Sequence, residues 1–201
     1  MKKIFFLLAV SLIAVSVYAQ DEQTDSKFFK KENMFTGGSV NLSFGNLTTA
    51  LGASPYIGYS LNKFVDVAAG FNINYISERD YSVPGDKLRQ TVYGPGAFIR
   101  LFPVKFLFAQ AQYEFNLIRD KYIPASGSGY APDRYKYDAH SLLIGLGFSN
   151  GRHPAYQKSY YYFSVLWDVA NATYSPYKDN FDRAVPIIRA GYNIALFQGR
   201  K

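Results

Sequence analysis

The stretch FLFAQAQYEFNLIR, residues 106–119, alternates between an apolar face and a face that carries most of its polar side chains. Its apolar face consists of Leu107, Ala109, Ala111, Tyr113, Phe115 and Leu117. The other face carries Phe106, Phe108, Gln110, Gln112, Glu114 and Asn116. A period of two is typical of a β-strand whose faces meet different surroundings. The run exceeds the usual strand length of about 5–6 residues, and it suits a tilted strand that crosses a bilayer, which needs roughly 9–11 residues.

The same alternation recurs along the chain and predicts eight strands. We place them at residues 35–44, 49–60, 64–76, 89–102, 106–119, 137–149, 159–169 and 184–197. Short links alternate with long ones, and the long links are residues 77–88, 120–136 and 170–183. This rhythm predicts an all-β fold, an eight-stranded antiparallel up-and-down transmembrane β-barrel over residues 35–197. Pro55 and Pro95 fall inside predicted strands without a ladder donor, so we expect a bulge or local break at each.

Composition excludes several chemistries. The chain has 201 residues and no cysteine, which removes disulfide scaffolds, thiolate zinc sites, cysteine nucleophiles and lipid attachment through cysteine. The 18 Tyr, 17 Phe and 16 Gly favour strands and turns over a helical bundle. The formal charge of +7 suggests an acidic partner. Because the basic residues are dispersed rather than gathered in a stripe, we expect no nucleic-acid binding.

The N-terminus predicts export. Met1-Lys2-Lys3 precedes an apolar run over residues 4–17, and Ala19 ends a sequence suited to signal peptidase. We expect a cleaved signal peptide at 1–19 and a flexible periplasmic leader at 20–34. The apolar run is short for a spanning helix, which needs roughly 20 residues. An exported chain of this pattern is either an outer-membrane barrel or a soluble periplasmic binding barrel similar to a lipocalin.

The small and polar face of the strands is the predicted interior. None of the charges on this face is lysine, which favours a lumen over a solvent-facing wall. We expect a luminal ion-pair network of Asp66, Arg100, Glu114, Asp168 and Arg189. Since buried charges need partners, Arg189 should pair with Glu114 or Asp168, and Arg100 with Asp66. Such a network plugs the lumen; the alternative is a narrow gated pore for small solutes.

The chain resembles the small outer-membrane barrels of the OmpA/OmpX type, including barrel-domain proteins common in Bacteroidetes. The resemblance covers residues 35–197 and is most specific in the last strand, where it implies an assembly signal for the barrel-assembly machinery. The residues of this signal are Gly191, Tyr192, Ile194, Leu196 and Phe197. The family often ends on an aromatic residue, whereas this chain ends with the tail at 198–201. The resemblance implies location in the outer membrane of a Gram-negative cell.

The sequence offers no catalytic set. Its two histidines are His140 and His153. His140 and Ser141 are adjacent, so they face opposite sides of a strand and cannot act as nucleophile and base. Two distant histidines and scattered acidic residues do not predict a metal site. We therefore expect neither an enzyme nor a bound metal or cofactor.

The long links carry the candidate binding residues, since they combine tyrosine with basic side chains, a mixture that suits anionic sugars or proteins. These residues are Tyr122, Tyr130, Arg134, Tyr135, Tyr174, Tyr177, Lys178 and Phe181. The sequence thus predicts a monomeric barrel with a structural, adhesive or surface-binding role through its extracellular loops. Expected partners are outer-membrane lipid and lipopolysaccharide, and a surface protein or glycan.

Overall fold

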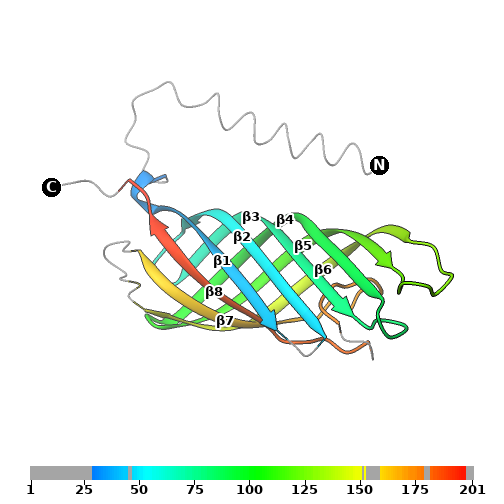
Figure 1. Ribbon diagram of the computed structural model, residues 1–201. Coiled ribbons are helices and arrows are strands. Elements are labelled where there is room, and N and C mark those ends of the chain that lie inside the picture. Colours follow the sequence, from blue (N-terminus) through cyan, green and yellow to red (C-terminus); the bar gives the residue numbers. More distant parts are fainter. Residues whose placement is uncertain (1–28, 45–46, 151, 153–158, 179–181, 198–201) are drawn as a thin grey trace, which may run out of the picture. The chain divides into compact units, whose positions relative to one another are not determined.

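The computed structural model describes residues 29–44, 47–150, 152, 159–178 and 182–197, and the eight strands among them form a closed barrel. A short 3-10 helix, η1, spans Lys31–Asn33. The strands are β1 (Met34–Phe44), β2 (Thr48–Ser60), β3 (Val65–Arg79), β4 (Lys87–Val104), β5 (Leu107–Ile123), β6 (Asp133–Asn150), β7 (Tyr160–Asp168) and β8 (Ile187–Ala195). Each strand pairs antiparallel with its sequence neighbours, and β8 pairs with β1 (Figure 1). The predicted all-β, eight-stranded antiparallel up-and-down barrel is confirmed.

The barrel has two distinct ends (Figure 1). At the terminal end lie the start of β1, the end of β8, the links at 61–64 and 105–106, the end of β6 and the start of β7. At the loop end lie the links at 80–86 and 124–132, the end of β1, the start of β2, the end of β7 and the start of β8. The signal peptide expected at 1–19 and most of the leader lie outside the described residues. The end of that leader is structured, because residues 31–33 form η1 and Met34 begins β1.

Burial shows that the polar face of the wall points inward. The buried polar side chains of the strands include Ser39, Asn72, Asn74, Gln110, Gln112, Asn116, Ser141 and Asn193. The outward face is apolar, with exposed side chains such as Leu51, Ile73, Ile99, Leu101, Ile144, Leu146, Phe163 and Ile188. None of the described residues belongs to a helix long and apolar enough to cross a membrane.

Both expected proline irregularities occur, and both are local breaks without a bulge. Pairing between β2 and β3 skips Ser54 and Pro55, then resumes at Tyr56 in the same register. Pairing between β4 and β5 likewise skips Gly94 and Pro95. Each proline lacks only its own N–H, so the ladder loses a bond but no residue has to be accommodated. A register shift occurs instead between Leu101 and Val104.

The walls of the barrel differ in length. Strands β3 to β6 have 15, 18, 17 and 18 residues, whereas β7 and β8 have 9 each. We call β3–β6 the long wall and β7, β8, β1 and β2 the short wall. The long wall is longer than predicted, because the residues at 77–79, 87–88, 120–123 and 133–136 are strand rather than loop. Their polar alternation continues the ladder past the apolar stretch.

Glycines create space for aromatic rings inside the barrel. A buried cluster fills the half of the lumen nearer the terminal end with Phe35, Tyr56, Ala68, Phe98, Phe102, Phe108, Tyr160 and Tyr162. A Cβ at Gly147 would lie 2.1 Å from the Phe108 ring. A Cβ at Gly191 would lie 2.4 Å from the Tyr162 ring. Small and large residues therefore alternate across the lumen, as close packing in a narrow barrel requires.

Candidate functional site

Glu114 on β5 is the hub of the polar lumen. Its Oε1 lies 2.9 Å from Nη2 of Arg189 on β8, and both side chains are at most 4% exposed. The same oxygen accepts a hydrogen bond from Gln112 at 2.8 Å. Tyr177 donates its hydroxyl to Oε2 at 2.5 Å. Of the two partners expected for Arg189, the structure thus brings Glu114 to it, and the contact joins the long wall to the short wall.

The expected ion pair between Asp66 and Arg100 does not form, although the two residues are direct neighbours across β3 and β4. Asp66 instead forms an ion pair of 2.7 Å with Arg152, from the link after β6. Arg152 also donates to the Lys63 carbonyl at 2.5 Å. Since Arg152 belongs to a link and not to a strand, strand periodicity gave no signal for this partner.

Arg100 is held by aromatic rings and an amide. Its Nε donates to Gln110 Oε1 at 2.8 Å, and its guanidinium carbon lies 4.0 Å from the Tyr162 ring centroid and 4.4 Å from that of Phe98. Such contacts favour a desolvated cation. The side chain is 2% exposed. The expected ion pair is therefore replaced by cation–π contacts.

Asp168 organises a loop rather than neutralising Arg189. Its Oδ2 accepts the Ser175 hydroxyl at 2.6 Å. Its Oδ1 accepts the backbone N–H groups of Leu142 at 3.0 Å and Ala170 at 3.1 Å. Hydrogen bonds from neutral donors stabilise a buried carboxylate. The predicted network thus has three carboxylate centres, Glu114, Asp66 and Asp168. A chain of hydrogen bonds through Gln110 and Gln112 links Arg100 to Glu114.

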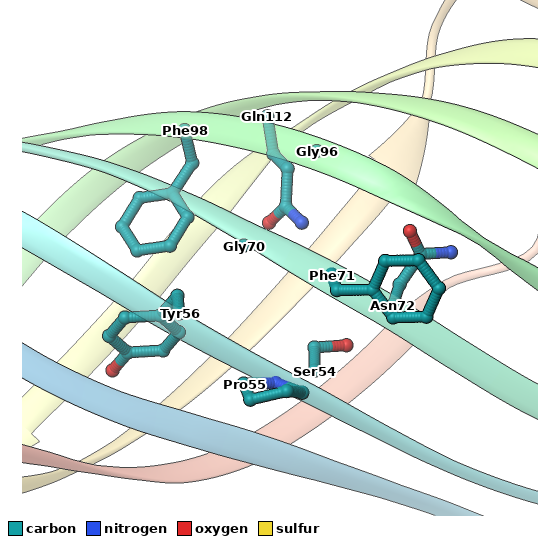
Figure 2. Close-up of a pocket in the computed structure, with 9 residues that line it drawn as sticks. All are labelled: Ser54, Pro55, Tyr56, Gly70, Phe71, Asn72, Gly96, Phe98 and Gln112. Atoms are coloured by element: carbon teal, nitrogen blue, oxygen red, sulfur yellow. The ribbon is translucent and has the colours of Figure 1, made fainter.

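Two lumenal cavities are small. One, of about 20 Å³, lies beside the break at Pro55, and Figure 2 shows Tyr56, Phe98 and Gln112 around it. The other, of about 10 Å³, is lined by residues that include Arg100 and Arg189. These volumes match one or two water molecules at most. Side chains therefore fill the middle of the described lumen, and a larger cavity of about 260 Å³ lies at the terminal end beside Phe102 and Arg152.

The first part of the link from β7 to β8 turns into the barrel at Ser175 and Tyr177. Tyr177, expected on the binding surface, is 8% exposed and contacts Glu114. Lys178, expected there too, has a side chain only 7% exposed, and it bonds Asp182 at 2.8 Å. The inward turn is favoured because Ser175 and Tyr177 supply donors to two buried carboxylates. Tyr174 stays exposed, with its ring 5.0 Å from that of Tyr137. Phe181 lies outside the described residues.

Tyr122 stabilises the loop at 80–86 and is not a free binding residue. It donates its hydroxyl to Asp86 at 3.0 Å. Desolvation of the buried Asp86 carboxyl raises its pKa, but hydrogen bonds from the backbone N–H groups of Val83 and Ser82 and from the Tyr122 hydroxyl outweigh it. The net effect holds the pKa of Asp86 below its ordinary value. Among the other predicted loop residues, Tyr130, Arg134 and Tyr135 are exposed.

A set of basic side chains lies on the outside of the long wall, where the sequence predicts loops and strand ends. Six exposed residues at the loop end share this face: Lys87, Arg89, Arg119, Lys121, Arg134 and Lys136. We call them the basic patch. Arg134 was among the candidate binding residues, and all six were assigned to predicted loops or strand ends. Their odd positions on β4 and β5 and even positions on β6 were the available signal, since these positions face outward.

The residues of the predicted assembly signal lie on both faces of the seam. Tyr192 and Ile194 point outward, and Gly191 lies against the Tyr162 ring. Leu196 and Phe197 follow the end of β8, which is at Ala195 and not at 197 as expected. Leu196 N–H still bonds the Met34 carbonyl at 2.9 Å. Recognition by the assembly machinery stays a prediction.

His140 and Ser141 occupy opposite sides of the wall. Ser141 is buried and accepts a hydrogen bond from Asn116 at 3.2 Å. His140 faces outward, where its ring lies 5.0 Å from that of Phe115 and its Nδ1 is 2.5 Å from the Tyr113 hydroxyl. Within the described part of the chain, no group of three His, Asp or Glu residues could hold a metal ion. His153 lies outside that part.

No family model and no curated protein matches the chain. Among solved structures it is similar to Ail, the attachment invasion locus protein of Yersinia pestis, solved with the heparin analogue sucrose octasulfate. The identity is 12%, the match covers 80% of this chain and 95% of that one, and the TM-score is 0.46. The chain is also similar to the N-terminal β-barrel domain of Pseudomonas aeruginosa OprF, with 12% identity and a TM-score of 0.41, and the match covers 81% of this chain and 95% of that one. For Neisserial surface protein A the identity is 15% and the TM-score is 0.36, and the match covers 81% of this chain and 96% of that one.

Proposed function

We propose that this protein is an integral outer-membrane β-barrel whose lumen is closed and whose loop end has a structural or surface-binding role. The observation that carries the proposal is the inverted wall, polar inside and apolar outside. A soluble barrel similar to a lipocalin would expose that apolar wall to water, which costs free energy in proportion to its area. A barrel in lipid has the opposite requirement.

The height of the apolar wall supports insertion in a bilayer. On β5 the outward residues are apolar from Leu107 to Leu117. Ten residue steps span about 33 Å along a strand. With the roughly 40° tilt of such barrels, this gives a band of about 25 Å, the height expected of a lipid-facing belt. The predicted signal peptide agrees with this location and puts the terminal end in the periplasm.

The filled lumen favours a plug over the gated pore. Glu114 binds Arg189 and Tyr177 near the loop end, and aromatic rings fill the other half. A charge pair this deeply buried is difficult to open, since separating it leaves two unpaired charges. The surface role then belongs to the exposed residues of the loop end, among them Tyr130, Arg134 and Tyr135.

A charge placed in the belt tests membrane insertion directly. Ile144 faces outward at mid-belt and is 46% exposed. Ile144→Lys should cost about 2–4 kcal/mol of folding free energy in a bilayer, and it should reduce the heat-resistant folded form in outer-membrane fractions. The matched control, Tyr135→Lys, lies above the belt and should insert normally.

Equal behaviour of the two variants, or release of the wild-type protein from cells without detergent, would overturn the membrane assignment. Planar-bilayer recording tests the closed lumen separately. We expect no conductance from the wild-type barrel, and steady single-channel currents would favour the pore.

A further inference from the structure

The basic patch is a two-dimensional array fixed by strand register. Arg89 pairs with Lys121, and Lys121 pairs with Arg134, so these three form one row across β4, β5 and β6. In the next row towards the belt, Arg119 pairs with Lys136. Neighbours across strands are about 5 Å apart and successive rows about 7 Å apart. Five cations therefore share a small area, and Lys87 lies beyond them on β4.

The patch directly borders the apolar belt. The row below it contains Tyr93, Leu117 and Asp138. Arg119 lies over the Tyr93 ring at 5.1 Å from its centroid, which fixes a cation at the level where aromatic residues meet the head groups. Asp138 contributes the acidic charge of this row. The array thus faces sideways, towards surrounding lipid, rather than upward to the medium.

We infer that the basic patch binds the phosphate groups of lipopolysaccharide in the outer leaflet, an inference that rests on the proposed function. A cluster of like charges is self-repulsive until a multivalent anion joins it. Guanidinium groups of Arg89, Arg119 and Arg134 supply paired donors suited to phosphate oxygens. A ligand at this position must have acyl chains in the belt and phosphate just above it. Lipid A has this architecture in the leaflet that the loop end faces.

The short wall provides the internal contrast. Its outward residues near the loop end are Leu42, Leu51, Trp167, Val169 and Ile188, all apolar and exposed. Lipid contact there is therefore apolar, whereas the long wall adds charge. The binding site is thus one side of the barrel and not a ring around it.

The test uses the folded full-length protein in detergent micelles, titrated with purified lipopolysaccharide. Arg89→Gln, Lys121→Gln and Arg134→Gln combined should weaken binding about tenfold, since each basic group near an anionic membrane surface contributes to affinity. The matched control combines Lys31→Gln, Lys63→Gln and Lys105→Gln at the terminal end, removes the same charge, and should bind as the wild type does. Lipopolysaccharide stripped of its lipid A phosphates should also bind about tenfold more weakly.

Equal weakening by both triple variants would overturn the inference, because it would show only general attraction. Undiminished binding of the dephosphorylated form, or equal competition by phosphatidylglycerol, would overturn the assignment to lipopolysaccharide. The heat-resistant folded form must persist in both variants, as exposed side chains allow. If the wild type proves water-soluble, the proposed function fails; if it inserts but binds no lipopolysaccharide, only this inference fails.

Discussion

The long and short walls of the barrel have the same apolar outer face but end differently. The long wall continues past the apolar belt as paired strand, with bases outside and Tyr122, Asp120 and Tyr137 inside. The short wall stops near the top of the belt, and its connecting loop turns inward to Glu114. The long wall thus extends past the apolar belt as paired strands. The short wall ends there, and Tyr177 from the link after β7 reaches into the lumen. Binding and closure are assigned to different halves of one sheet.

The largest expected effect comes from breaking the contact that joins the two walls. Glu114→Ala leaves Arg189 buried without its carboxylate, which should destabilise the barrel by about 3–5 kcal/mol. Urea unfolding in lipid vesicles measures this. The double variant Glu114→Gln with Arg189→Met removes both charges and should recover much of the loss. A single variant as stable as the wild type would show that the ion pair does not join the walls.

Tyr177→Phe tests the closure of the short wall. It removes one hydrogen bond to a buried carboxylate, worth about 1.5–3 kcal/mol. The loop at 169–186 should then become more sensitive to protease added outside intact cells. Tyr174→Phe in the same loop is the control, since Tyr174 is exposed. Equal protease sensitivity of the two variants would contradict an inward loop.

A pair of neighbouring glycines in the short wall tests which face is inside. A Cβ at Gly37 would lie 2.4 Å from the Tyr192 carbonyl oxygen, whereas at Gly38 the nearest atom is 3.7 Å away. Gly37→Ala should therefore destabilise by about 1–3 kcal/mol through overpacking, and Gly38→Ala should be tolerated. The same urea titration compares them, and the reverse order would mean that the strand faces the other way.

The smallest effect is the pH response of the loop at 80–86 in the long wall. Because the pKa of Asp86 is held below its ordinary value, its carboxylate stabilises the loop fully above the unfolded pKa of about 3.9. That stabilisation is lost as pH falls through the lower folded pKa. NMR shifts of the Ser82 and Val83 amides should follow this titration below pH 4. Asp86→Asn should abolish it, and a midpoint above pH 4 would contradict the assignment.

The fold could be predicted from sequence because alternation is a local property. The two faces of FLFAQAQYEFNLIR differ in polarity, so the period of two predicted both the strand and the face that lines the lumen. The predicted strand ends in the long wall were wrong because Lys87, Lys121 and Arg134 are polar and resemble loop residues. Outside the belt both faces of a strand meet water, and the apolar signal that marks a strand disappears there.

The candidate site was less predictable because its partners come from links. Asp66 forms an ion pair with Arg152, and Glu114 accepts a hydrogen bond from Tyr177. Both Arg152 and Tyr177 lie outside the strands. Arg189 and Glu114 could be matched, since both are inward and at similar depth in predicted strands. Arg100 has the same kind of position, but the nearby rings of Tyr162 and Phe98 decided its environment. The strand register determines which residues are neighbours across strands. Which of those neighbours a side chain contacts depends on the other groups within its reach.

The ring of strands has no natural first member. Met34 and Leu196 are joined by a backbone hydrogen bond at the terminal end, so a short linker could connect the two ends and the chain could be opened at Gly127-Ser128-Gly129 instead. Every ladder would be retained in such a circular permutant, but Gly191, Tyr192 and Ile194 would no longer belong to the last strand. In the natural chain β8 is both the strand that pairs with β1 to close the barrel and the last strand to be synthesised. The permutant would separate these two properties.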